Sequence, residues 1–172
     1  MWDGPFDSFE AFEAQLKEKC ASEDSLFFAI VDNADGRAKG RAAFMRIEPM
    51  DRCLEVGHIV YGPALQRTPY ATEAMYLMAR YVFEELGYRR YEWKCDVRNE
   101  ASRRAALRLG FTFEGIFRQH MIVKGHNRDT AWFSMLDSEW PNRKRNFERW
   151  LSPANFDEAG HQRISLSKLN AE

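Results

Sequence analysis

Cysteines are few in this sequence, and their spacing argues against two kinds of site. The 172-residue chain has three of them, Cys20, Cys53 and Cys95, which lie far apart and lack the spacing of metal ligands. An odd number of scattered cysteines is typical of a reducing compartment, where disulfides do not persist. We therefore expect a cytoplasmic protein without a metal site, with Cys95, and Cys53 as a second candidate, as small core residues.

Long apolar runs and an excess of one charge are also lacking. No run approaches the roughly 20 apolar residues that a membrane-spanning helix needs. The opening segment Met1–Pro5 has neither the basic head nor the apolar stretch of a signal peptide. The net charge is −1, which gives no electrostatic reason for binding nucleic acid or an anionic membrane. We expect neither as a partner.

What the chain does have is the pattern of one mixed α/β domain. Its composition is 45% hydrophobic and 30% charged, as in ordinary globular proteins. Apolar periodicity and turn residues predict, in order, helix 6–20, strands 26–31, 41–47 and 54–61, helix 69–86, strand 88–97, helix 99–110, and strands 111–123 and 129–136. We expect a domain over residues 1–140, followed by a helix and irregular tail over 141–172.

The strand–helix–strand unit from Leu54 to Val97 decides the topology of the predicted sheet. A right-handed crossover makes its two strands parallel, whereas the short connections elsewhere make the other neighbours antiparallel. We therefore predict a mixed, mostly antiparallel sheet with one parallel crossover and helices on both faces.

The segment Leu65–Thr72 is the first candidate site. A strand that runs directly into a helix N-terminus presents unpaired N–H groups at the positive end of the helix dipole. Arg67 adds a positive charge, and Thr68 and Thr72 add hydroxyl donors. A diphosphate suits these donors. The alternative is an ordinary strand-to-helix turn with a surface arginine, and this segment alone does not decide between them.

The segment Asn99–Phe111 is the second. Asn99 is a suitable N-cap for a helix, and Ser102 lies one turn later on the same face. Both side chains would then meet one ligand. Taken alone, this segment is more often a capped amphipathic helix than a binding site.

Together the two segments resemble the GNAT superfamily of N-acetyltransferases. In that family a strand-to-helix loop grips the pyrophosphate of CoA, and a later helix opens with Asn and ends in Leu-Gly-Phe. The residues that carry the resemblance are Gln66, Ala71, Asn99 and Leu109-Gly110-Phe111. Further segments resemble the ribosomal-protein N-terminal acetyltransferase branch, namely Glu55–His58, Thr72–Ala74, Asn99 with Ser102, Glu114–Arg118 and Asp137–Pro141.

The resemblance implies acetyl-CoA as co-substrate and assigns residues to it. The backbone of Ile59 to Tyr61 would align the pantetheine arm and polarise the acetyl carbonyl. The remaining cofactor-binding residues would be Gln66, Arg67, Thr68, Ala71, Thr72, Asn99 and Ser102.

Three features depart from the family pattern. Pro69 stands where the phosphate loop has its central glycine, and it contributes no N–H. Ala106 stands where many members carry a tyrosine as general acid. The family's first strand is missing before the helix that begins at Phe6. A sheet that starts one strand short exposes an edge, which favours pairing of two copies as a homodimer.

Acetyl transfer to an amine requires a neutral nitrogen and a stabilised thiolate. An α-amino group ordinarily titrates at pH 7.7 to 8.0, so a base acting through water suffices. Glu55 is the first candidate base and His58 the second, on opposite faces of the strand by parity. Their structural alternatives are an ion pair with an arginine for Glu55 and a core-edge hydrogen bond for His58. Ser102 would donate a hydrogen bond to the leaving sulfur, as the branch resemblance implies.

The acceptor is left open by the residues. An N-terminal α-amine of a protein or peptide is our first prediction. A small-molecule amine such as an amino acid, a polyamine or an antibiotic is the second, and a non-catalytic CoA-binding or interaction module is the third. Four aromatic side chains of the last two strands are expected to frame the acceptor side: Phe113, Phe117, Trp132 and Phe133.

Overall fold

A capped helix begins the part of the chain that the computed structural model describes, which runs from residue 4 to residue 171. Helix α1 spans Phe9–Cys20, and the Ser8 Oγ accepts a hydrogen bond from the Ala11 N–H at 3.2 Å. This confirms Ser8 as the N-cap. The prediction that the chain opens without a signal peptide rests partly on residues 1–3, which lie outside the described residues.

Six strands form one sheet in the order β1-β2-β3-β4-β6-β5. The strands are β1 (Ser25–Val31), β2 (Ala38–Glu48), β3 (Cys53–Tyr61), β4 (Arg90–Asp96), β5 (Thr112–Val123) and β6 (His126–Leu136). Strands β3 and β4 pair in parallel, and the other neighbours pair antiparallel. The predicted mixed sheet with one parallel crossover is therefore confirmed.

The crossover between β3 and β4 is a helix that changes its winding. Helix α2 spans Pro69–Arg80 and continues as a π-helical turn over Tyr81–Glu85. It ends before Gly87, whose φ of +63° is the left-handed conformation expected at a helix end. After β4, helix α3 (Glu100–Arg108) leads to β5.

The β5–β6 hairpin is tighter than the sequence predicts. Lys124 and Gly125 have φ of +49° and +76°, the conformation of a two-residue hairpin turn. Strand β6 therefore begins at His126, not at Asp129. The β1–β2 turn agrees with the prediction, because the Gly36 N–H donates to the Asp32 carbonyl at 2.8 Å.

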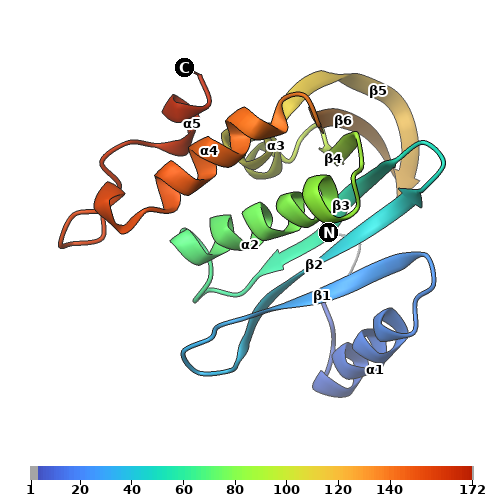
Figure 1. Ribbon diagram of the computed structural model, residues 1–172. Helices are drawn as coiled ribbons and strands as arrows, with labels where there is room; N and C mark the ends of the chain where they lie inside the picture. The colour runs from blue at the N-terminus through green and yellow to red at the C-terminus, as the bar shows by residue number, and fades with distance from the viewer. Residues whose placement is uncertain (1–3, 172) are drawn as a thin grey trace.

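One face of the sheet carries the main core. Figure 1 shows α2 crossing this face, with α4 (Trp140–Leu151) beside it. A short 3-10 turn (Pro153–Asn155) and α5 (Leu166–Leu169) follow. Side chains from both helices join the strand residues in one buried cluster, which includes Met75, Phe83, Tyr91, Trp93, Phe133, Phe147, Trp150, Leu166 and Leu169. The division of the chain at residue 140 stays a prediction, although α4 and α5 pack into this core.

The opposite face meets α1 beside β1. The Lys19 Nζ lies 4.9 Å from the centre of the Phe27 ring, whereas the neighbouring Phe28 packs on Phe44 in the core. Helices therefore flank both faces, as predicted. The outer edge of β1 pairs with no other strand of residues 4–171, and the homodimer stays a prediction.

Candidate functional site

The parallel strands β3 and β4 separate halfway along their length. Their pairing runs from Cys53 opposite Arg90 to Val56 opposite Trp93 and then stops. Beyond that point β3 pairs with β2, and β4 pairs with β6. The backbone edges of residues 57–61 and 94–96 thus face a gap in the sheet. An extended ligand with amide groups would find hydrogen-bonding partners along this gap.

A bulge in β3 lies at the point of separation. His58 has a φ of +50°, and the register with β2 shifts between the partners of Ala43 and Arg41. The His58 ring packs against Phe27, with ring centroids 5.1 Å apart. Because Phe27 lies on the face away from α2, His58 shares that face with Glu55. The prediction that Glu55 and His58 point to opposite faces is wrong, since a bulge adds one residue to the alternation.

Glu55 is buried on that face and is bound by two cations. It is 4% exposed, and its Oε2 lies 2.8 Å from the Arg46 Nη1 and 3.1 Å from the Lys94 Nζ. The structural alternative for Glu55, an ion pair with a nearby arginine, is therefore observed. The Glu55 carboxylate is therefore already engaged by Arg46 and Lys94.

The ion pairs continue across β4 to β5. Lys94 also bonds Glu92 at 2.6 Å, and Glu92 bonds the Arg90 Nε at 2.7 Å. Arg90 in turn holds Glu114 through two hydrogen bonds. Hydrogen bonding by Arg90, supported by Ser134, lowers the pKa of Glu114 to about 2 against a smaller effect of burial. Each carboxylate in this row has a basic partner.

The loop before α2 uses several of its polar groups internally. The Gln66 Nε2 donates to the Tyr61 carbonyl at 2.9 Å, and the Thr68 Oγ1 donates to the Leu65 carbonyl at 2.7 Å. Thr68 therefore occupies the N-cap position without capping through its side chain. Arg67 is exposed and has a φ of +60°.

The helix N-terminus after this loop retains two open donors. Pro69 stands at the first helical position and has no N–H. The amides of Tyr70 and Ala71 are the remaining first-turn donors, because an α-helix leaves its first N–H groups without internal partners. Thr72 follows, buried at 3% exposure.

The opening of α3 lies beside β4. The Asn99 Oδ1 accepts from the Ser102 N–H at 3.1 Å, which confirms Asn99 as the N-cap. The Ser102 Oγ accepts from the Trp93 Nε1 at 2.9 Å. Cys95 is also near this hydroxyl, and burial raises the pKa of its thiol. Cys95 is thus a buried core thiol rather than an activated nucleophile.

The four aromatic side chains of the last strands divide between the two faces. Phe133 is 1% exposed in the core beneath the helices, and Phe113 packs on it with centroids 5.4 Å apart. Trp132 and Phe117 lie on the other face, 5.8 Å apart. The expectation that all four frame the acceptor side is wrong, because adjacent positions of a strand point to opposite faces.

The sequence reasoning missed Lys94, His120 and Arg108. The Lys94 Nζ lies 4.0 Å from the centre of the Trp132 ring, next to Glu55. His120 follows a bulge at Gln119, bonds Thr130 at 3.0 Å, and has its pKa lowered by burial and by nearby cations. Alternation with the core residues of β4 would have placed Lys94 on the face of Glu55. No sequence signal predicts the bulge at Gln119.

Arg108 closes the space between α2 and α3. Its Nη1 donates to the Thr72 Oγ1 at 3.0 Å, and its guanidinium lies over the Trp150 ring at 4.8 Å. Tyr61 is close by, and burial raises the pKa of its phenol to about 12. The predicted site residues Tyr61 and Thr72 therefore meet at Arg108, whereas Glu55 and His58 lie on the other face of the sheet.

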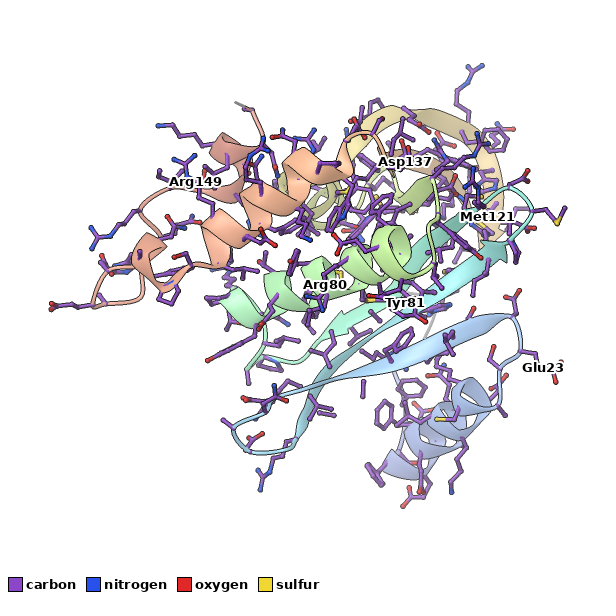
Figure 2. All side chains as sticks on the ribbon, viewed as in Figure 1. Glu23, Arg80, Tyr81, Met121, Asp137 and Arg149 are labelled. Atoms are coloured by element: carbon purple, nitrogen blue, oxygen red, sulfur yellow. The ribbon has the colours of Figure 1, made fainter. Side chains whose placement is uncertain are left out.

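A separate cavity of about 860 Å³ lies between β1 and α2. Its lining is mainly apolar and includes Phe28, Phe44, Leu77 and Tyr81. Figure 2 shows Tyr81 on the side of the helix that faces β1 and β2. None of the predicted catalytic residues lines this cavity.

None of the helices in residues 4–171 is long and apolar enough to cross a membrane. Within the same residues no group of three or more His, Cys, Asp or Glu side chains is placed to hold a metal ion.

Comparison with known proteins identifies the family. The model of the acetyltransferase (GNAT) domain matches residues 3–112. The chain belongs to the GNAT family. The crystal structure of a GCN5-related N-acetyltransferase from Brucella melitensis is 52% identical, covers 100% of this chain and 78% of that one, and superposes with a TM-score of 0.96.

Two curated GNAT relatives carry names that mention ribosomes. Bacillus subtilis YdaF, provisionally named a ribosomal N-acetyltransferase, is 30% identical over 110 residues, which are 64% of this chain and 60% of YdaF. The ribosomal-protein-serine acetyltransferase of Escherichia coli is 31% identical over 101 residues, 58% of this chain and 56% of that protein. The matched regions thus span less than two thirds of either relative.

Proposed function

We propose that this GNAT protein transfers an acetyl group from acetyl-CoA to a primary amine. The observation that carries the proposal is the gap that opens after Val56 and Trp93. It is flanked by the N-terminus of α2 on one side and the capped start of α3 on the other. Membership of the family supports the same activity.

The gap suits the long, amide-bearing arm of acetyl-CoA. The backbone of Ile59 and Tyr61 would pair with its pantetheine amides, in place of the strand partner that β3 has lost. The loop and first turn of α2 would hold the diphosphate through Arg67, Ala71 and Thr72. Gln66 and Thr68 would support this loop from inside, since their side chains bond its carbonyl groups.

The reaction forms a C–N and an S–H bond and breaks a C–S and an N–H bond. The amine nitrogen attacks the thioester carbonyl carbon, the C–S bond breaks, and the amine gives up a proton while the thiolate gains one. We propose that His58 takes the first proton through water, because Glu55 already binds two cations. Glu55 would then hold Arg46 and Lys94 in place.

Ser102 is the residue that we propose to hydrogen-bond the leaving sulfur. Its Oγ accepts from the Trp93 Nε1, and its O–H, which bonds the Cys95 thiol in this structure, would turn to the sulfur of the bound co-substrate. A hydroxyl at this place would stabilise the departing thiolate, and Asn99 would fix the helix start beside it. Positioning and hydrogen bonding would then supply most of the rate.

For the acceptor we propose an N-terminal α-amine of a protein or peptide. The names of the two curated relatives support this class. A binding site for a polyamine needs acidic side chains whose charge is not already neutralised by basic neighbours. The carboxylates of Glu55, Glu92 and Glu114 are instead all held by basic side chains. We further propose that the protein acts in the cytoplasm, without nucleic acid, a membrane or a metal, and as a homodimer.

Thiol release from acetyl-CoA tests the proposal. Peptides with free N-termini, the same peptides with blocked N-termini, free amino acids and spermidine would be compared at fixed acetyl-CoA. We expect release with the free peptides and background rates with the blocked ones. A larger rate with spermidine or amino acids would favour the small-molecule alternative. Binding of acetyl-CoA without release for any acceptor would support a non-catalytic module and overturn the proposed activity.

A further inference from the structure

Arg108 is a partly buried cation that forms no ion pair with an acidic side chain of residues 4–171. It extends from the last turn of α3 to the first turns of α2, where its Nη1 donates to the Thr72 Oγ1 at 3.0 Å. The ring of Trp150 covers it at 4.8 Å. Burial lowers its pKa, and the phenol of Tyr61 is the one neighbour that opposes this effect.

Some other partly buried cations have a carboxylate partner, whereas Arg103 and Arg143 bond the backbone carbonyls of Val97 and Asn170. Arg90 bonds Glu92 and Glu114, Lys94 bonds Glu55 and Glu92, and Lys144 bonds Glu84. Within residues 4–171, Arg108 has no such ion pair. A charge partly removed from water without a counter-charge is costly, so an anion bound beside Arg108 would be stabilised by it.

The groups around Arg108 are also donors. The Thr72 Oγ1 accepts from Arg108, which leaves the threonine O–H hydrogen to be donated elsewhere. Thr72 lies in the first turn after the open amides of Tyr70 and Ala71. A guanidinium, a hydroxyl and a helix N-terminus thus occur together at the end of the gap beside Tyr61. All three groups donate hydrogen bonds, and an anion with several oxygen atoms would accept from all of them at once.

We propose that Arg108 binds the diphosphate of acetyl-CoA and supplies the donor that Pro69 lacks. The inference rests on the proposed function, because it assigns a residue to that same site. A guanidinium has five N–H donors in a rigid plane and bonds two phosphate oxygens at once, which a lysine ammonium does not reproduce.

The test compares two acetyl donors within each variant. Acetyl-CoA carries the diphosphate, and S-acetylpantetheine carries no phosphate. The readout is the ratio of kcat/KM for the two donors, which does not depend on the folded fraction of a variant. The variants are R108Q, R108K and, as a matched control, R104Q. Arg104 lies one turn earlier on α3, is exposed, and pairs with Glu100.

For R108Q we expect the ratio to fall by about 10- to 100-fold, the effect of losing a hydrogen-bonded charge pair. R108K should be intermediate, and R104Q should match the wild type. Inorganic pyrophosphate should inhibit the wild type with acetyl-CoA and inhibit R108Q much less. An equal loss with both donors would mean a structural role and overturn the proposal.

Acetyl-3′-dephospho-CoA, which keeps the diphosphate but lacks the 3′-phosphate, shows which of these two groups Arg108 contacts. If R108Q still has a lower kcat/KM than the wild type with this donor, the result supports binding of the diphosphate by Arg108. If the difference disappears, Arg108 binds the 3′-phosphate instead and the proposal is overturned. Calorimetry with CoA separates the two proposals. A wild type that binds no CoA contradicts the proposed function itself, whereas equal binding by wild type and R108Q contradicts the role of Arg108 alone.

Discussion

The indole Nε1 of Trp93 donates a 2.9 Å hydrogen bond to the Ser102 Oγ. This bond joins the last residue of β4 that pairs with β3 to the first turn of α3, at the position where the two parallel strands separate. It also fixes the orientation of the serine hydroxyl, since the lone pair that accepts from the indole is no longer available to other donors. The O–H itself bonds the Cys95 thiol in this structure.

Replacing Ser102 by Ala should lower kcat by about tenfold, the effect of roughly 1.4 kcal/mol at the transition state. The KM for acetyl-CoA should change little, because the hydroxyl is proposed to act on the leaving sulfur. Trp93→Phe removes the orienting donor and should give a smaller loss. Steady-state thiol release checks both, with thermal unfolding as a control. An unchanged kcat in S102A would remove the proposed role.

The buried pair of Glu55 and Lys94 should show strong coupling in stability. Glu55→Gln leaves the buried Lys94 with one carboxylate fewer, and breaking a buried ion pair costs about 3–5 kcal/mol. The double variant E55Q/K94M should be less destabilised than the sum of the two single changes. Urea unfolding of all four proteins measures this coupling. Additive losses would show that the two side chains act independently.

Stability should fall in acid through Glu114. Its pKa is held at about 2 in the folded protein, chiefly by hydrogen bonds from Arg90, against a usual value of 4.5. A lowered pKa contributes stability above the ordinary value, and this contribution is lost as the pH falls toward the folded value. The window is therefore about pH 5 to 2. Glu114→Gln should flatten this part of a urea-unfolding profile, whereas the exposed control Glu100→Gln should leave it unchanged.

Cysteine labelling should separate the exposed thiol from the buried one. Cys20 is exposed and Cys95 is buried, with its pKa raised by burial. A thiol reagent should modify Cys20 rapidly and Cys95 only when the protein unfolds. Cys95→Ala should keep most of the acetyl-transfer activity. Loss of activity with retained stability in C95A would instead support a covalent acetyl-cysteine step.

The periodic parts of the fold were predictable from the sequence. The helices at Phe9–Cys20 and Pro69–Arg80 follow from caps and apolar spacing, and the parallel pairing of β3 and β4 follows from the crossover between them. These features depend on local propensity and on the handedness of connections, which a single sequence carries. The cap at Asn99 was predictable for the same reason.

The candidate site was predictable only in outline. The bulge that turns His58 onto the face of Glu55 is a local backbone choice in which the histidine itself has a φ of +50°, and the preceding Gly57 alone does not predict it. The partners of Glu55 come from β2 and β4, far away in sequence. Arg108 appears in the sequence as one basic residue of an amphipathic helix, and packing against Thr72 and Trp150 is what distinguishes it.

The short pairing between β3 and β4 has a mechanical consequence. In the described sheet, β1, β2 and β3 form one half and β4, β6 and β5 the other, and they are joined by the four residue pairs from Cys53–Arg90 to Val56–Trp93. A ligand in the gap would bond the backbone edge of β3 as an added strand does, and it would stabilise the connection between the two halves of the sheet. Amide hydrogens of Gly57 to Tyr61 should then exchange with solvent more slowly once it binds, and the two halves of the sheet should unfold together.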